Sequence, residues 1–147
     1  MHYFADTEFD APTRSLISLA LVPLEGASLY LADPEVMKRD NIDPWVKEHV
    51  LPIVDVEGYT PQYMTPDEMR KSLETYFQGE KGIVVHVDWP IDMTYLSELL
   101  ITGPGTMIDI PSIVFQLHRV EPYPVKREND YVQHNALCDA LALREAL

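Results

Sequence analysis

The sequence predicts an α/β domain in which helices cover a mixed β-sheet. Three strand-like segments open the chain, and segments with helical spacing then alternate with further strand-like runs. The chain has 147 residues, of which 46% are hydrophobic, enough to build one domain with a proper core. We expect a single domain over residues 1–147, because no linker, repeat or low-complexity segment divides the chain.

The three opening strands are expected within residues 1–10, at residues 15–24 and at residues 28–32. Residues 15–24 (SLISLALVPL) form a continuous apolar run that is typical of a buried strand. A Glu25-Gly26 turn signal separates this run from the third strand. Short connections between successive strands indicate an antiparallel meander.

Residues 65–78 carry the clearest helix signal. Thr65 is a typical N-cap, Pro66 suits the first helical position, and Glu68 completes a capping box. Gly79 is expected to end this helix. A shorter helix is predicted within residues 41–54. The residues that indicate its start and end are Asp43, Pro44 and Pro52.

The second half of the chain alternates strands and helices. Residues 82–87 (GIVVHV) predict a buried strand, residues 90–101 a helix and residues 112–120 a further strand. Residues 121–125 are rich in proline and predict a loop, and residues 131–147 predict a closing helix.

The net charge of −13 limits the function classes. Proteins that bind nucleic acid usually present basic surface, because contacts with phosphates release counterions. So acidic a chain is expected to avoid nucleic acid, to touch it only at a pocket loaded with cations, or to mimic DNA. Composition does not choose among these three.

The location is expected to be the cytoplasm. No apolar run reaches the length of a membrane span, and the first residues do not form a signal peptide. The single cysteine, Cys138, excludes an internal disulfide framework and suits a reducing compartment.

Two carboxylates two positions apart, Asp6 and Glu8, lie on the first predicted strand. Residues i and i+2 of a strand project from the same face, so the pair could hold one divalent cation or one each of two. The alternative is a half-buried strand with two solvated acids.

Two further acids, Asp88 and Asp92, follow the strand predicted at residues 82–87. Acids at such a junction lie near the edge of a sheet, where sites are often built. The structural alternatives are that Asp88 caps the next helix and that Asp92 complements its dipole.

His134 and Asp139 form the third cluster. Five residues of helix turn through about 500°, so the two would not share a face of one continuous helix. We expect His134 on the entering loop or in the first turn, and Asp139 well inside the helix among apolar neighbours. Buried acids are rare unless they are paired or bound to metal. The alternative is an exposed histidine and one more surface acid.

These motifs, in this order, resemble those of the DEDDh 3′–5′ exonucleases of the RNase H-like superfamily. The matching residues are Asp6-Thr7-Glu8, then Asp92 followed by Leu96, then His134 and Asp139. Many members carry His-Asn before the second-motif aspartate, where this chain has Val87-Asp88. This leaves Asp88 as an alternative ligand, although Leu96, four residues on, favours Asp92.

A narrower resemblance is to the RNase AS-like small exoribonucleases. It rests on Tyr3-Phe4 before the first motif, on Leu16-Ile17-Ser18, on Trp45-Val46 leading to His49-Val50-Leu51-Pro52, and on the residues from His134 to Ala140.

The resemblance implies an RNase H-like fold with a five-stranded mixed sheet, its first three strands antiparallel, flanked by helices. It implies a metal-dependent 3′–5′ exonuclease that acts on a single-stranded 3′ end, RNA more than DNA, and a homodimer. Two Mg²⁺ or Mn²⁺ ions would be bound by Asp6, Glu8, Asp92 and Asp139. His134 would be the general base, since histidine titrates near neutral pH. Thr7, Phe9 and Trp89 would meet the nucleotides, although core packing is the stronger expectation for Trp89.

Other functions remain open at this stage. A DNA exonuclease of the same family is the closest alternative, and a non-catalytic acidic mimic or interaction protein is the second. A related fold that acts on a nucleotide or another phosphodiester is the third. Basic residues that could contact phosphates are Lys38, Arg39, Arg119, Lys126 and Arg127; a solvated charge cluster is the alternative for each.

Overall fold

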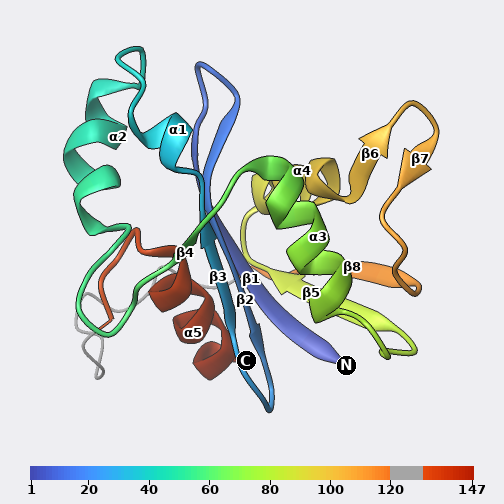
Figure 1. The fold of residues 1–147 in the computed structure, drawn as a ribbon. Helices are drawn as coiled ribbons and strands as arrows, with labels where there is room; N and C mark the ends of the chain where they lie inside the picture. Colours follow the sequence, from blue (N-terminus) through green and yellow to red (C-terminus); the bar gives the residue numbers. More distant parts are fainter. Residues whose placement is uncertain (120–130) are drawn as a thin grey trace.

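The computed structural model describes residues 1–119 and 131–147, which form a mixed α/β fold around one twisted sheet (Figure 1). In spatial order the six strands are β4 (Gln62–Tyr63), β3 (Leu29–Ala32), β2 (Ser15–Pro23), β1 (His2–Asp10), β5 (Ile83–Val87) and β8 (Ile113–Leu117). β1, β2 and β3 pair antiparallel in succession, whereas β5 is parallel to β1 and to β8. The antiparallel meander predicted for the first three strands is confirmed.

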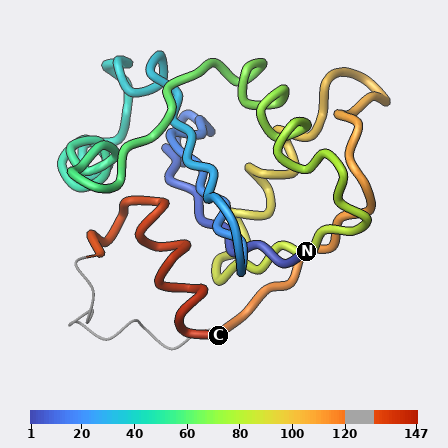
Figure 2. Tube along the Cα trace, turned by 60° about the horizontal axis from the view of Figure 1, so that its bottom comes forward, coloured from blue at the N-terminus to red at the C-terminus, as the bar shows by residue number. Residues whose placement is uncertain are grey.

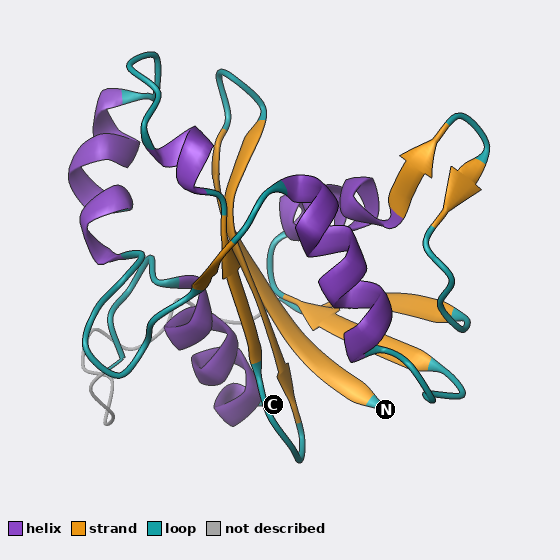
Figure 3. Ribbon diagram, in the orientation of Figure 1, coloured by secondary structure: helices purple, strands orange, loops and turns teal. Residues whose placement is uncertain are grey.

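The strand count differs from the expected five because β4 adds to the edge of the sheet beside β3. β4 has only two residues, too few for a hydrophobic pattern to show in the sequence. A separate hairpin of β6 (Ile101–Gly103) and β7 (Thr106–Met107) was also not predicted. It projects from the body of the molecule after α4 (Pro90–Leu100) (Figure 3).

The helices begin where capping residues place them. Asp43 accepts from the Trp45 N–H at the start of α2 (Pro44–His49), and Thr65 accepts from the Glu68 N–H at the start of α3 (Pro66–Tyr76). Residues 41–54 do not form one helix: α2 ends at His49, and a 3₁₀ turn, η1 (Leu51–Ile53), follows with Pro52 inside it. The remaining helices are α1 (Pro34–Met37) and α5 (Ala136–Ala146).

Helices cover both faces of the sheet, and Figure 2 shows α5 running beside the first strands. Tyr3 and Ala5 of β1 pack with α3 and α4 on one face. Phe4, between them, packs on the other face with Ala136, Ala140 and Leu143 of α5. Among the helices of residues 1–119 and 131–147, none combines the length and the apolar character needed to cross a membrane.

This alternation determines where the acids of β1 point. Asp6 and Glu8 follow Phe4 at intervals of two, so they project on the face that α5 covers. β5 runs parallel to β1, and its carboxyl end therefore delivers Asp88 and the start of α4 beside the second half of β1. Three elements distant in sequence meet there.

Candidate metal centre

The four predicted ligands and His134 converge in the structure as two adjoining groups. Glu8, His134 and Asp139 form one group, and Asp6, Asp88 and Asp92 form the other. Within each group, one potential ligand atom per residue lies within 4.8 Å of the others. These acidic clusters could bind metal ions.

Two carboxylate oxygens in the second group are buried without compensation. Asp6 Oδ2 and Asp92 Oδ2 have no hydrogen-bond partner within the described residues 1–119 and 131–147. An ionised oxygen removed from water in this way is costly unless a cation or a proton is supplied. Carboxylate oxygens are also the donors that Mg²⁺ and Mn²⁺ prefer. The donor set therefore fits hard divalent cations.

The pKa values of Asp6 and Glu8 are raised, which favours the protonated forms of these two carboxyl groups. Burial, and then the charges of Asp92 and Glu8, raise the pKa of Asp6 well above its ordinary value. Burial, the charges of Asp139 and Asp92, and a hydrogen bond with Asp139 raise the pKa of Glu8 to about 9. Mutual repulsion of this kind is what a bound cation would relieve.

Thr7 points to the face of β1 opposite to Asp6 and Glu8, and there it holds Asp92 in place. Its backbone N–H and its hydroxyl group both donate to Asp92 Oδ1, at 3.2 and 2.5 Å. These bonds lower the pKa of Asp92, but burial raises it more, and the net value is about 7. The backbone N–H of Thr7, expected to meet the nucleotide, thus already donates to Asp92, one of the predicted ligands.

Asp88 and Trp89 differ from the expectations. Trp89, not Asp88, occupies the N-cap of α4, and its side chain makes no capping hydrogen bond, so the prediction of an Asp88 cap is wrong. Asp88 lies instead in one group with Asp6 and Asp92. The Trp89 side chain is 58% exposed, so the prediction that it packs in the core is also wrong.

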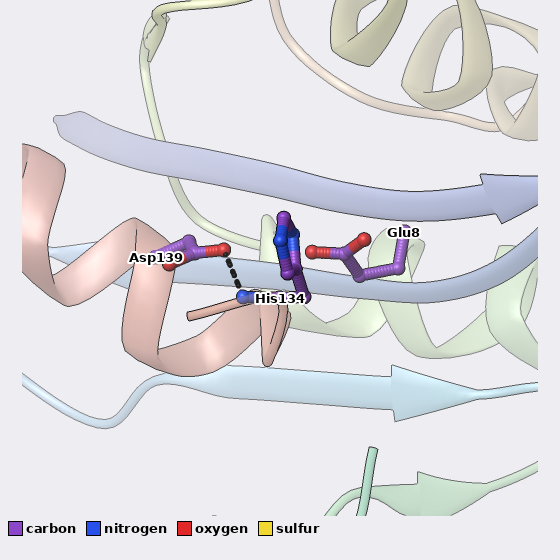
Figure 4. A group of neighbouring side chains, drawn as sticks. All are labelled: Glu8, His134 and Asp139. Carbon is purple, nitrogen blue, oxygen red and sulfur yellow. Dashed lines mark hydrogen bonds between the residues drawn. The ribbon is translucent and has the colours of Figure 1, made fainter. Parts of the chain in front are cut away.

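His134 lies on the loop that enters α5, as predicted. Its backbone is left-handed, with φ of 69°, and its N–H donates to Asp139 Oδ2 at 2.9 Å. Figure 4 shows the imidazole ring standing between Asp139 and Glu8. Trp45 of α2 packs against this ring in a T-shaped contact, with centroids 5.2 Å apart. Asp139 is in the first turn of α5, not well inside the helix as expected, because the helix begins at Ala136 and not at residue 131.

Asn135 fixes this loop, a role that the sequence analysis did not assign. The side-chain oxygen accepts from the Cys138 N–H and caps α5, while the amide nitrogen donates to the carbonyls of Ile53 and Val54 at 2.8 and 3.2 Å. Asn135 is fully buried. The asparagine before an alanine-rich helix was the signal that could have located this cap.

We expect Asn135→Ala to destabilise the protein by about 2–4 kcal/mol, since it removes an N-cap and the side-chain donor to the Ile53 carbonyl, whereas the Val54 carbonyl keeps the Tyr30 hydroxyl as donor. Urea unfolding followed by circular dichroism measures this loss. The matched control is Asn41→Ala at an exposed position, with an expected change below about 0.5 kcal/mol. An equally small change at both positions would show that Asn135 does not anchor the loop.

The other residues predicted to contact the substrate belong to neither acidic group. Phe9 is half-buried and stacks on Tyr95 of α4, with centroids 4.8 Å apart. Lys38 pairs with Glu35 in an exposed ion pair, and Arg119 is exposed. Lys126, Arg127 and the predicted loop at residues 121–125 lie outside the described residues.

Comparisons with known proteins find no family model that matches this chain and no curated protein that matches it. The functional argument therefore depends on the fold and the site. Together they define an α/β protein whose mixed sheet carries acidic clusters that could bind metal ions.

Proposed function

We propose that this protein is a metal-dependent 3′–5′ exonuclease of the DEDDh type with an RNase H-like fold. It hydrolyses single-stranded nucleic acid from the 3′ end, prefers RNA to DNA, and releases nucleoside 5′-monophosphates. The observation that carries the proposal is the convergence of Asp6, Glu8, Asp92, Asp139 and His134 from three separate elements. Among them, Asp6 Oδ2 and Asp92 Oδ2 are buried with no hydrogen-bond partner in the described part of the chain.

The sheet supports the family part of the proposal. The run β3-β2-β1-β5-β8 contains five strands, with the first three of the chain antiparallel, as the resemblance implies. β4 is an addition at the outer edge of β3, and no residue of the two acidic groups lies on it.

Asp6, Glu8, Asp92 and Asp139 are the residues that would hold two Mg²⁺ or Mn²⁺ ions. Bound there, the ions would stabilise the attacking and leaving oxygens of an in-line displacement at phosphorus. The chain itself orients the ligands: Thr7 fixes one oxygen of Asp92, and the His134 N–H fixes one oxygen of Asp139. Asp88 lies close enough to Asp6 and Asp92 to serve as a further ligand.

His134 is the proposed general base, accepting the proton of the attacking water. Its ring lies beside Glu8 and Asp139, and the contact with Trp45 limits the orientations that the ring can adopt. A base must come within hydrogen-bond reach of the proton it removes, and a side chain on a loop can adjust to do so.

We expect His134→Ala to slow hydrolysis by roughly 100-fold or more, because the water then lacks its base. Single-turnover rates with saturating metal and RNA measure this loss. The matched control is His2→Ala, which removes an exposed imidazole at the start of β1 that contacts His86 and belongs to neither acidic group, and which should retain turnover. Full activity of His134→Ala would remove the proposed base.

The burial of the acids disfavours the alternative of an acidic mimic. A mimic needs its charges spread over an exposed surface, whereas five of these carboxylates gather in one half-buried to buried cluster. Trp89 is exposed beside Asp88, which suits stacking of an unpaired base, and Phe9 follows Glu8 directly. The homodimer and the cytoplasmic location belong to the same proposal; the buried cysteine Cys138 is compatible with a reducing compartment.

The test uses RNA and DNA oligonucleotides labelled at the 3′ or the 5′ end, incubated with Mn²⁺, Mg²⁺ or EDTA. We expect stepwise shortening from the 3′ end of RNA that EDTA stops, faster than for DNA. Asp139→Asn should lose this activity, while Asp109→Asn, at an exposed acid, should keep it. The absence of metal-dependent cleavage of either nucleic acid would refute the proposal, and faster DNA cleavage would transfer it to a DNA exonuclease.

A further inference from the structure

A cavity of about 200 Å³ lies at the tip of the β1–β2 hairpin, apart from the two acidic groups. Two arginines, Arg14 and Arg39, line it together with Ser15 and Asp33. Its remaining walls are mainly apolar and consist of Leu16, Val36, Pro66, Met69 and Leu99. The cavity therefore combines two positively charged residues with mainly apolar lining residues.

Arg14 occupies a backbone position that disfavours it. Its φ is 53°, and its N–H closes the hairpin turn by donating to the Ala11 carbonyl at 3.2 Å. Glycine or asparagine is usual at such a left-handed turn position, so an arginine there adds backbone strain. The ion pair of Arg14 with Glu98, at 3.9 Å, is weak because both side chains are more than half exposed.

Arg39 is directed to the same cavity by a hydrogen bond. Its Nη1 donates to Ser15 Oγ at 2.8 Å, and Thr13 Oγ1 lies 3.0 Å from the same oxygen. Asp33, the one acid among the described residues that line the cavity, already accepts the Glu35 and Val36 N–H groups at the start of α1. Two arginines beside hydroxyl groups are a suitable donor set for a phosphate group.

We infer that this cavity binds a phosphate group, with Arg14 and Arg39 as its charged donors. In a chain with a net charge of −13, two arginines at one cavity form a local site that can offset repulsion of an anion. The phosphate is carried either by a small organic molecule, whose apolar part the apolar lining residues accommodate, or by a nucleic-acid strand.

The alternative in which a nucleic-acid strand carries the phosphate rests on the proposed exonuclease function. α4 connects the cavity to the metal centre: Asp92 lies at its start, Leu99 lines the cavity, and seven helical residues span about 10 Å. Phe9, stacked on Tyr95, lies between the two along this helix. A strand whose 3′ end is at Asp92 would thus pass Phe9 and bring an upstream phosphate to Arg14.

The test measures binding to the metal-free protein in EDTA, where nothing is cleaved, by titration calorimetry and amide NMR. The probes are inorganic phosphate, a nucleoside 5′-monophosphate and a single-stranded pentanucleotide. Arg14→Gly removes the guanidinium group and fits the left-handed backbone, so it should keep or raise the melting temperature while weakening binding by at least about fivefold. Arg39→Gln should weaken binding similarly. The control Lys71→Gln removes an equal charge at another surface and should change little.

The comparison among probes distinguishes the two sources. Tighter binding of the pentanucleotide, with a slope of log K against log salt that Arg14→Gly reduces by about 0.7, assigns the phosphate to a strand. Equal binding of all three probes, lost in the same variants, assigns it to a free anion. The inference is overturned if the protein binds no probe, or if Arg14→Gly and Arg39→Gln bind every probe as Lys71→Gln does. A protein without nuclease activity could still pass this test, so the two proposals fail separately.

Discussion

Replacing Asp6 with asparagine is expected to abolish metal-dependent hydrolysis and, at the same time, to stabilise the metal-free protein. Asp6 Oδ2 is buried with no hydrogen-bond partner among residues 1–119 and 131–147, and the charges of Asp92 and Glu8 oppose its ionisation. A neutral side chain of the same shape removes this repulsion but also a metal ligand. Turnover should fall at least about 1,000-fold. At pH 8 the free energy of unfolding should rise by about 1–2 kcal/mol in EDTA.

The matched control is Asp10→Asn, at a second aspartate of the same strand. Burial raises the pKa of Asp10, but hydrogen bonds from Thr13 and from the Asp43 N–H outweigh it and leave the pKa lowered. This carboxylate is therefore stabilised by the fold, and the variant should lose about 1–3 kcal/mol. If Asp6→Asn also lost stability, or kept its turnover, the two aspartates would not differ as the structure indicates.

The second large effect is a loss of stability of the metal-free protein as the pH rises. The folded-state pKa is raised to about 9 for Glu8 and to about 7 for Asp92, above their ordinary values of 4.5 and 3.8. A carboxyl group with a raised folded-state pKa contributes stability that is complete below its ordinary pKa. That stability is lost as the pH rises through the folded value. Between pH 5 and pH 9 the free energy of unfolding should therefore fall by at least about 3 kcal/mol in EDTA.

Divalent cations should cancel this loss, because they bind the ionised carboxylates of the folded state only. Urea unfolding at pH 5.5 and 8.5, with EDTA or with excess Mg²⁺, measures both parts of the effect. If the free energy of unfolding in EDTA is equal at the two pH values, the raised pKa values of Glu8 and Asp92 are contradicted. A loss that Mg²⁺ does not reverse would separate the cluster from metal binding.

Much of the fold could be predicted because local signals and tertiary packing agree. The apolar run of β2 and the capping residue Thr65 of α3 placed their elements within a few residues. The spacing of Asp6 and Glu8 predicted a shared face of β1, and the structure brings Asp92, Asp139 and His134 to these two acids.

The remainder depends on contacts that local sequence patterns do not encode. The two-residue strand β4 exists only through its pairing with β3, and α2 gives no hint that Trp45 will pack against His134. Asp88 matched the position of an N-cap, but Trp89 takes that position and Asp88 joins the acidic group. Such choices are decided by tertiary neighbours.

The most direct test of the central claim is a count of bound metal ions. Mn²⁺ is titrated into the protein, and free and bound ions are distinguished by electron paramagnetic resonance. We expect two ions per chain, with the spectral broadening of a coupled pair, and loss of the pair in Asp6→Asn but not in the Asp109→Asn control. Absence of bound Mn²⁺, or two ions that Asp6→Asn leaves unchanged, would contradict the assignment of Asp6, Glu8, Asp92 and Asp139 as a two-metal site.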